Sequence, residues 1–181
     1  DIKNVYLDKD NNIYDLKGHL FLENNEVSKL NLESEFTNQR KVKLTINNNG
    51  EEKITTLFSQ EAKPLVNRYK FIKGFDEGNL EFVSYKKDGI SNSKLIIDNF
   101  KVKEVPALAK LLSLASLQGI ADLLTGEGLR FTDFEMNFTN EKNLMKIEEI
   151  YAIGPSISIL LEGYLEKEMY KKINLKFLLF S

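Results

Sequence analysis

Apolar and polar residues alternate along most of this chain, and this period of two constrains the fold more than any other feature. Successive side chains of a β-strand point to opposite faces of the sheet, so strict alternation predicts strands with one apolar face. The clearest segments are Lys29–Phe36, Lys41–Ile46, Leu80–Phe82, Asp133–Phe138, Ile157–Leu165 and Ile173–Phe177. The pattern therefore predicts a β-rich protein.

Short polar segments separate the alternating runs. They are Asp8–Asn12, Asn24–Glu26, Thr37–Arg40, Asn47–Gly50, Lys86–Ser93, Asn140–Asn143 and Glu166–Met169. Asn, Asp and Gly tolerate positive φ and favour tight reversals. Strand, short turn and strand in repetition predict an antiparallel meander, curled into a groove or forming a partly open barrel or sandwich.

Two segments follow helical spacing instead. Residues 59–72 predict a helix capped by Ser59, with Pro64 early in its sequence. A longer helix is predicted at about 106–124, from Pro106 to a glycine C-cap at Gly126, and its leucines make it apolar almost all round. The fold class is thus α+β with strands dominant. The chain divides into a meander at 1–58, a helix–strand–helix region at 59–125 and a second meander at 126–181.

The composition excludes several classes of function. The 25 basic and 27 acidic residues give a net charge of −2, which is no footprint for nucleic acid. The chain has no Cys and one His, so thiolate chemistry, disulfides and conventional zinc sites are excluded. His19 is interpreted as a surface strand residue. The pair Asp133 and Glu135 falls on the solvated side of its strand, so we expect no catalytic residue, no metal and no cofactor.

The function then depends on what the apolar residues face. No stretch is long enough to span a bilayer as a helix, because Val105–Leu124 is interrupted by Pro106, Lys110, Gln118 and Asp122. One alternative is that the leucine-rich helix fills a closed β-sandwich core. The other is that the apolar sheet face forms an open groove or cavity for acyl chains, which needs few polar residues. The pattern alone leaves both open.

One region resembles a known family. A strand ending in Asn99-Phe100-Lys101-Val102 runs into Pro106-Ala107-Leu108-Ala109 and the leucine-rich helix. Gly126-Glu127-Gly128, Phe134–Phe138, Gly154-Pro155-Ser156 and Leu161–Leu165 follow. This order resembles the AsmA-like C-terminal region of large Gram-negative envelope proteins, the YhdP-type family of bridge-like lipid-transfer proteins. The resemblance covers about residues 79–167, and the first 47 residues share only the β meander.

The resemblance implies a function without covalent chemistry. Proteins of this family resemble bridges that are anchored in the inner membrane and extend through the periplasm. It implies that this chain is a periplasmic fragment of such a protein, with its N-terminal anchor missing and further repeats of the same chain beside it. Phospholipid or another acyl lipid would be bound or guided along the apolar groove between inner and outer membrane. The alternative is a structural or interaction β module with a closed core and no lipid site.

The lipid-facing candidates are apolar residues chosen from the pattern. They are Leu108, Leu111, Leu112, Leu117 and Ile120 on the predicted helix, and Phe134, Met136, Ile157 and Ile159 on strands.

Overall fold

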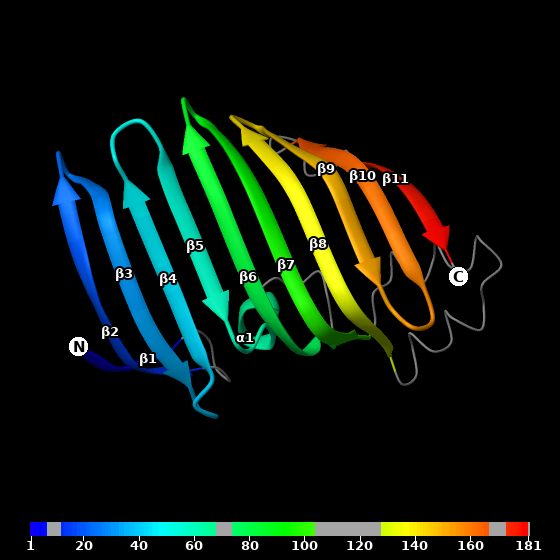
Figure 1. Ribbon diagram of the computed structural model, residues 1–181, viewed down its shortest axis with the longest axis horizontal. Helices are drawn as coiled ribbons and strands as arrows, with labels where there is room; N and C mark the ends of the chain where they lie inside the picture. The colour runs from blue at the N-terminus through cyan, green and yellow to red at the C-terminus, as the bar shows by residue number, and fades with distance from the viewer. Residues whose placement is uncertain (7–11, 68–73, 104–127, 167–172, 181) are drawn as a thin grey trace.

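The strands pair in the order in which they occur along the chain. The computed structural model describes residues 1–6, 12–67, 74–103, 128–166 and 173–180. Within them, eleven strands form one antiparallel sheet in the order β1 to β11, so each strand is hydrogen-bonded to its neighbours in sequence (Figure 1). The sheet is twisted and open, and the predicted meander is confirmed. It is one sheet, neither closed into a barrel nor folded into a sandwich.

The strand bounds follow the alternating runs of the sequence. The first six strands are β1 Ile2–Tyr6, β2 Asn12–Glu23, β3 Glu26–Phe36, β4 Lys41–Asn48, β5 Lys53–Ser59 and β6 Asp76–Lys87. The remaining five are β7 Ile90–Val102, β8 Leu129–Glu141, β9 Leu144–Ile153, β10 Ser158–Glu166 and β11 Ile173–Phe180.

Tight turns join several of these strands, as predicted. Asn24 and Asn25 have φ of 50° and 66° and form a two-residue turn between Glu23 and Glu26, which are directly opposed. Asp88 and Gly89 make the corresponding reversal between β6 and β7. Positive φ at both central residues matches the twist of the flanking strands, which explains why these residue types mark the turns.

Neither predicted helix is confirmed. Within the described part of this range, residues 59–67, the structure has one helical turn, α1, at Lys63–Val66, near the end of β5 and the start of β6. Ser59 does not cap it but ends β5, paired with Val42 and Leu80, and its hydroxyl donates to the Glu61 carbonyl at 2.6 Å. The pairing on both sides of β5 overrides the local capping signal, and α1 begins beside Pro64 instead. The predicted helix at 106–124 lies outside the described residues.

The core is aromatic and lies where α1 meets the middle strands. The Phe100 ring stacks on Phe75 and on Phe131, with centroids 5.3 and 5.4 Å away, and meets Phe134 edge-on at 6.2 Å. Ala62 and Val66 of the α1 region belong to the same buried cluster. These contacts fix the lower ends of β6, β7 and β8 together.

A backbone irregularity keeps these phenylalanines on one face. Ile97 and Phe100 are three residues apart, an odd spacing that would place them on opposite faces of a regular strand. Asn99 has φ of 52° and Gly78 on the paired strand has φ of 80°, so the alternation breaks between them. Both Ile97 and Phe100 consequently belong to the buried cluster. A Cβ at Gly78 would lie 3.0 Å from the Phe100 Cβ, so the sequence has glycine there.

Candidate functional site: the apolar face of the sheet

One row of apolar residues crosses eight consecutive strands. Each member is directly opposite the next in the strand register, from β3 to β10. The row is Leu32, Leu44, Leu57, Phe82, Leu95, Met136, Ile150 and Leu161. Directly opposed residues share a face, and strands lie about 4.8 Å apart, so the row is about 34 Å wide. We refer to these eight residues as the apolar row, and to their side of the sheet as the apolar face.

A second row runs parallel to it on the same face. Leu80, Ile97, Phe134, Ala152 and Ile159 oppose one another in turn from β6 to β10. Leu80, Ile97 and Ala152 are buried, whereas Phe134 and Ile159 are half-buried and pack against them. The apolar face is therefore continuous in two directions, along the strands and across them.

Burial divides the apolar face into two parts. Over β6 to β9 the second row and the phenylalanines near α1 are buried. Over β2 to β4 the face is open: Leu20 and Leu22 are 56% and 58% exposed, and Leu32 and Leu44 are half-buried. Exposed apolar area of this kind is costly in water unless a ligand or partner covers it. The accessible part of the face thus lies at the N-terminal end of the sheet.

Four of the predicted lipid-facing residues are within the described chain, and the structure brings them together on the apolar face. Met136 belongs to the apolar row, and Phe134 and Ile159 belong to the second row. Ile157 precedes β10 and is only 2% exposed, within the buried cluster. The other five, Leu108, Leu111, Leu112, Leu117 and Ile120, lie outside the described residues.

Sequence reasoning missed the more accessible residues of this face. Leu20, Leu32, Leu44 and Ile46 stand on the open strands, yet the pattern-based candidates concentrate on the chain after residue 107. The signal was present, because these residues are the apolar members of the alternating runs. What the alternation did not contain was the extent of burial, which depends on what packs over each strand.

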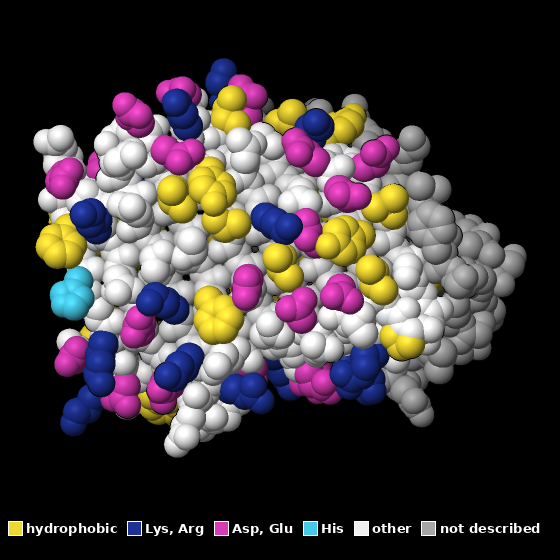
Figure 2. All heavy atoms as spheres, viewed as in Figure 1, with side chains coloured by type: hydrophobic (Ala, Val, Ile, Leu, Met, Phe, Trp, Pro, Cys, Tyr) yellow, Lys and Arg dark blue, Asp and Glu magenta, His cyan; other side chains and the backbone are white. Residues whose placement is uncertain are grey.

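The opposite face carries charges of both signs with apolar side chains between them, as Figure 2 shows for the view of Figure 1. We call it the polar face. Lys43 Nζ lies 2.7 Å from Glu33 Oε1 on two adjacent strands. His19 is exposed on β2, as predicted, and so is Asp133 on β8. Surface pairs of this type contribute little to stability and keep the face soluble.

Glu135 is a half-buried carboxylate of the polar face. Its side chain is 15% exposed, and its Oε1 atom lies 2.7 Å from Lys94 Nζ. Asn137 and Tyr151 donate further hydrogen bonds to the same carboxylate, each at 2.9 Å. The hydrogen bond from Lys94 is the main cause that lowers the pKa of Glu135, and the bond to this carboxylate raises the pKa of Tyr151. Glu135 is thus held ionised, which suits a structural contact and not a general acid.

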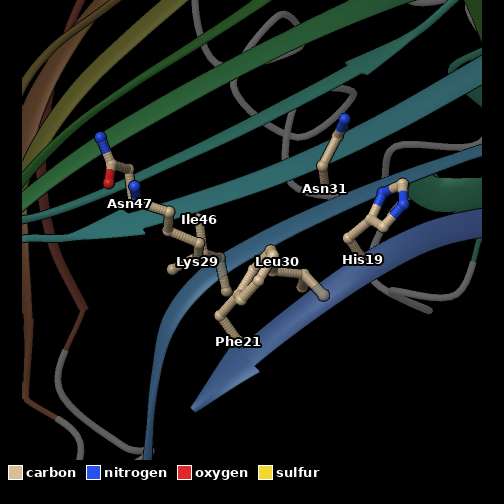
Figure 3. Close-up of a pocket in the computed structure, with 7 residues that line it drawn as sticks. All are labelled: His19, Phe21, Lys29, Leu30, Asn31, Ile46 and Asn47. Atoms are coloured by element: carbon tan, nitrogen blue, oxygen red, sulfur yellow. The ribbon is translucent and has the colours of Figure 1, made fainter. Parts of the chain in front are cut away.

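An open hollow lies over β2, β3 and β4. Figure 3 shows its seven lining residues: His19, Phe21, Lys29, Leu30, Asn31, Ile46 and Asn47. Its volume is about 470 Å³. Five of these residues are on the polar face, and the paired residues Leu30 and Ile46 alternate with them in sequence. The hollow combines one cation, one imidazole and one exposed aromatic ring, without a carboxylate among its lining residues.

The described ranges contain neither a cluster of possible metal ligands nor a helix that could span a membrane. Within them no three residues among His, Asp and Glu come together as metal ligands would. No helix there has the length and hydropathy needed to cross a bilayer. Comparisons with protein-family models, curated proteins and solved structures found no match to this chain.

Proposed function

We propose that the apolar face binds the acyl chains of a lipid, and that its open part on β2 to β4 is where lipid makes contact. The observation that carries this proposal is the apolar row, which presents an apolar residue on each of eight adjacent strands. Each methylene removed from water contributes roughly 0.8 kcal/mol, so an acyl chain lying across several strands gains substantial free energy.

The chemistry of the face favours sliding over capture at one point. Its accessible members are aliphatic, and their contacts with a hydrocarbon chain are similar at every strand. Specific hydrogen bonds would instead hold a lipid at one position. In this proposal the sheet is a curled groove within a periplasmic, inner-membrane-anchored protein of the AsmA-like type. Phospholipid tails lie on the apolar face while the headgroup stays in water, and no bond is made or broken.

The proposal can be tested with pairs of adjacent substitutions on opposite faces. Leu32→Asp adds a carboxylate to the apolar row, whereas Asn31→Asp adds the same group one residue away on the polar face. Ile46→Asp and Asn47→Asp form a second pair on β4. Ile157 is unsuitable for this purpose, because at 2% exposure its replacement by Asp would unfold the protein.

Binding is measured by titrating the protein into phospholipid that carries a pyrene-labelled acyl chain, with native mass spectrometry of the purified protein as a second readout. We expect Leu32→Asp and Ile46→Asp to weaken binding by about tenfold or more, since a buried aliphatic side chain contributes roughly 1.5–3 kcal/mol. Asn31→Asp and Asn47→Asp should bind as the unchanged protein does. Absence of binding, or equal losses within each pair, would favour a structural β module with a closed core.

A further inference from the structure

The apolar face changes its chemistry along β5, β6 and β7, from the β4–β5 and β6–β7 turns at one end to α1 at the other (Figure 1). The strand register aligns its residues in rows across these three interior strands. The row beside the turns is Lys53, Lys86 and Ser91. The next row is Thr55, Ser84 and Ser93, and after it come the apolar-row residues Leu57, Phe82 and Leu95. Along the strands the face therefore passes from cations to hydroxyls to hydrocarbon.

Two lysines of the first row are directly opposed on β5 and β6. We refer to Lys53 and Lys86 as the lysine pair. Like charges at directly opposed positions are destabilising. Neither lysine forms an ion pair with a described residue, although Glu51 and Glu52 precede Lys53 in the turn. The pair therefore places positive charge, without a bound carboxylate, at the rim of an apolar surface.

The hydroxyl row lies between this charge and the apolar row. Ser93 is 8% exposed, and its hydroxyl donates to Ser84 Oγ at 2.8 Å. A serine hydroxyl has one hydrogen to donate, so that of Ser84 stays available to a further acceptor. Thr55 is half-buried and directly opposite Ser84. The second row thus offers neutral donors where the face is neither charged nor apolar.

We propose that this part of the face selects glycerophospholipids with a net negative headgroup and binds them in one direction. The phosphate lies at the lysine pair, the ester groups at the hydroxyl row and the acyl chains on the apolar row towards α1. This inference rests on the proposed lipid function and adds the headgroup class and the orientation to it. The rows follow the order of chemical groups in such a lipid. Lys53 and Leu57 are four strand residues apart, about 13 Å, which keeps the charge away from the chains.

The lysine pair favours one headgroup without trapping the lipid. Lys86 is exposed and Lys53 half-buried, and ion pairs at such positions are weak and screened by salt. We expect them to tighten binding of an anionic phospholipid by about fivefold, which still permits the lipid to leave for neighbouring strands. A zwitterionic headgroup has its own cation next to the phosphate and gains little from the pair.

The first test compares two pyrene-labelled phospholipids with identical acyl chains, phosphatidylglycerol and phosphatidylcholine, titrated with the 181-residue protein. The unchanged protein should bind phosphatidylglycerol more tightly. The double variant Lys53→Gln, Lys86→Gln should lose this preference and keep its affinity for phosphatidylcholine. Lys87→Gln is the matched control, because Lys87 is the exposed neighbour of Lys86 on the polar face. It should keep the preference.

Inorganic phosphate, added at constant ionic strength, distinguishes a lipid headgroup from a free anion. It has no chains to place on the apolar row, so millimolar phosphate should leave the preference for phosphatidylglycerol in place. Displacement of this lipid by micromolar phosphate would identify a free-phosphate site and overturn the proposal.

The second test determines the direction of the lipid, and it uses the absence of tryptophan from the chain. A phosphatidylglycerol with bromine at the ends of its acyl chains quenches an indole that lies close to those ends. Quenching should be stronger for Leu57→Trp than for Ser91→Trp, which lies in the row of the lysine pair. Circular dichroism verifies both folds, and Leu44→Trp, in the same row as Leu57, serves if Leu57→Trp does not fold.

Equal affinity of the unchanged protein for the two lipids, a preference that survives the double variant, or an equal loss in Lys87→Gln would overturn the headgroup assignment. Quenching at Ser91→Trp as strong as at Leu57→Trp would overturn the direction. Each of these results leaves the proposed lipid function in place, whereas failure to bind either lipid would end both proposals.

Discussion

Tyr151 and Glu135 are directly opposed on β9 and β8, and the tyrosine hydroxyl donates to Glu135 Oε2 at 2.9 Å. Lys94 binds the other oxygen from β7, so one carboxylate connects three strands of the polar face. This contact lies behind the apolar face, and it holds the strands that carry Met136 and Leu95 in register.

Replacing this carboxylate should remove a contribution to stability that depends on pH. Because the folded protein lowers the pKa of Glu135, its contribution is fully present above the unfolded pKa of about 4.3 and is lost as pH falls through the folded value. We expect Glu135→Gln to cost about 1–2 kcal/mol at neutral pH. The difference from the unchanged protein should shrink below pH ~4.

Urea denaturation at several pH values measures this difference. The exposed Glu149 provides the control, and Glu149→Gln should change the free energy of unfolding by less than about 0.5 kcal/mol. A Glu135→Gln deficit that grows as the pH is lowered would contradict the assignment of an ionised Glu135.

The aromatic core makes a second prediction. Phe100 contacts Phe75, Phe131 and Phe134, so Phe100→Ala should lower the free energy of unfolding by about 3–5 kcal/mol. Phe58→Ala, on the polar face and 38% exposed, should cost about 1 kcal/mol or less. Chemical denaturation compares the two, and Phe100→Leu serves if the alanine variant does not fold. Equal costs at Phe58 and Phe100 would place the core elsewhere.

Ile157 is buried next to a point where the backbone at Gly154 lies close to the backbone of Arg130. A Cβ at Gly154 would lie 2.4 Å from the Arg130 carbonyl oxygen, and the Gly154 N–H donates to the Ile157 carbonyl at 3.0 Å. Gly154→Ala should therefore destabilise the protein by about 1–3 kcal/mol, whereas Ser156→Ala, at an exposed position, should have little effect. Thermal denaturation followed by circular dichroism distinguishes them, and an unchanged Gly154→Ala melting temperature is the contrary result.

If lipid binds through apolar contact, its affinity should be nearly independent of salt. Interactions between exposed charges are screened at high ionic strength, whereas hydrophobic burial is not weakened by it. Titration of a zwitterionic, pyrene-labelled phospholipid at low salt and at about 1 M salt, where the Debye length is about 3 Å, measures this. A large loss of affinity at high salt would indicate that charged groups of the polar face hold the lipid.

The sheet was predictable from the sequence because its information is local. Alternation fixes which residues of β3 or β4 share a face, and Asn24-Asn25 identifies its own turn. The break at Asn99 and Gly78 was not predictable in the same way. It depends on three phenylalanines, distant in sequence, that gain more by packing together than the strands lose by an irregular residue.

The helix predicted at 59–72 was not confirmed, for a related reason. Ser59 and Pro64 are ordinary helix-start residues, but Ser59 is paired on both sides within the sheet, and local propensity is weaker than two strand ladders. The sequence predicted which face of the sheet forms the candidate site, but not which residues of that face are accessible. Phe134 and Ile157 obey the same alternation as Leu32, and only the folded arrangement separates the buried residues from the accessible ones.

A sheet whose strands follow one another in chain order can change its width without being rewired. Each interior strand contacts the strand before it and the strand after it in the sequence. Inserting or deleting one hairpin would therefore change the width of the sheet, which is the platform for binding, by two strands, while the remaining strands keep their partners. Evolution can therefore lengthen or shorten such a platform in small modular steps, in the way that tandem-repeat scaffolds grow. The surface it offers is set by the number of hairpins and does not require a new topology.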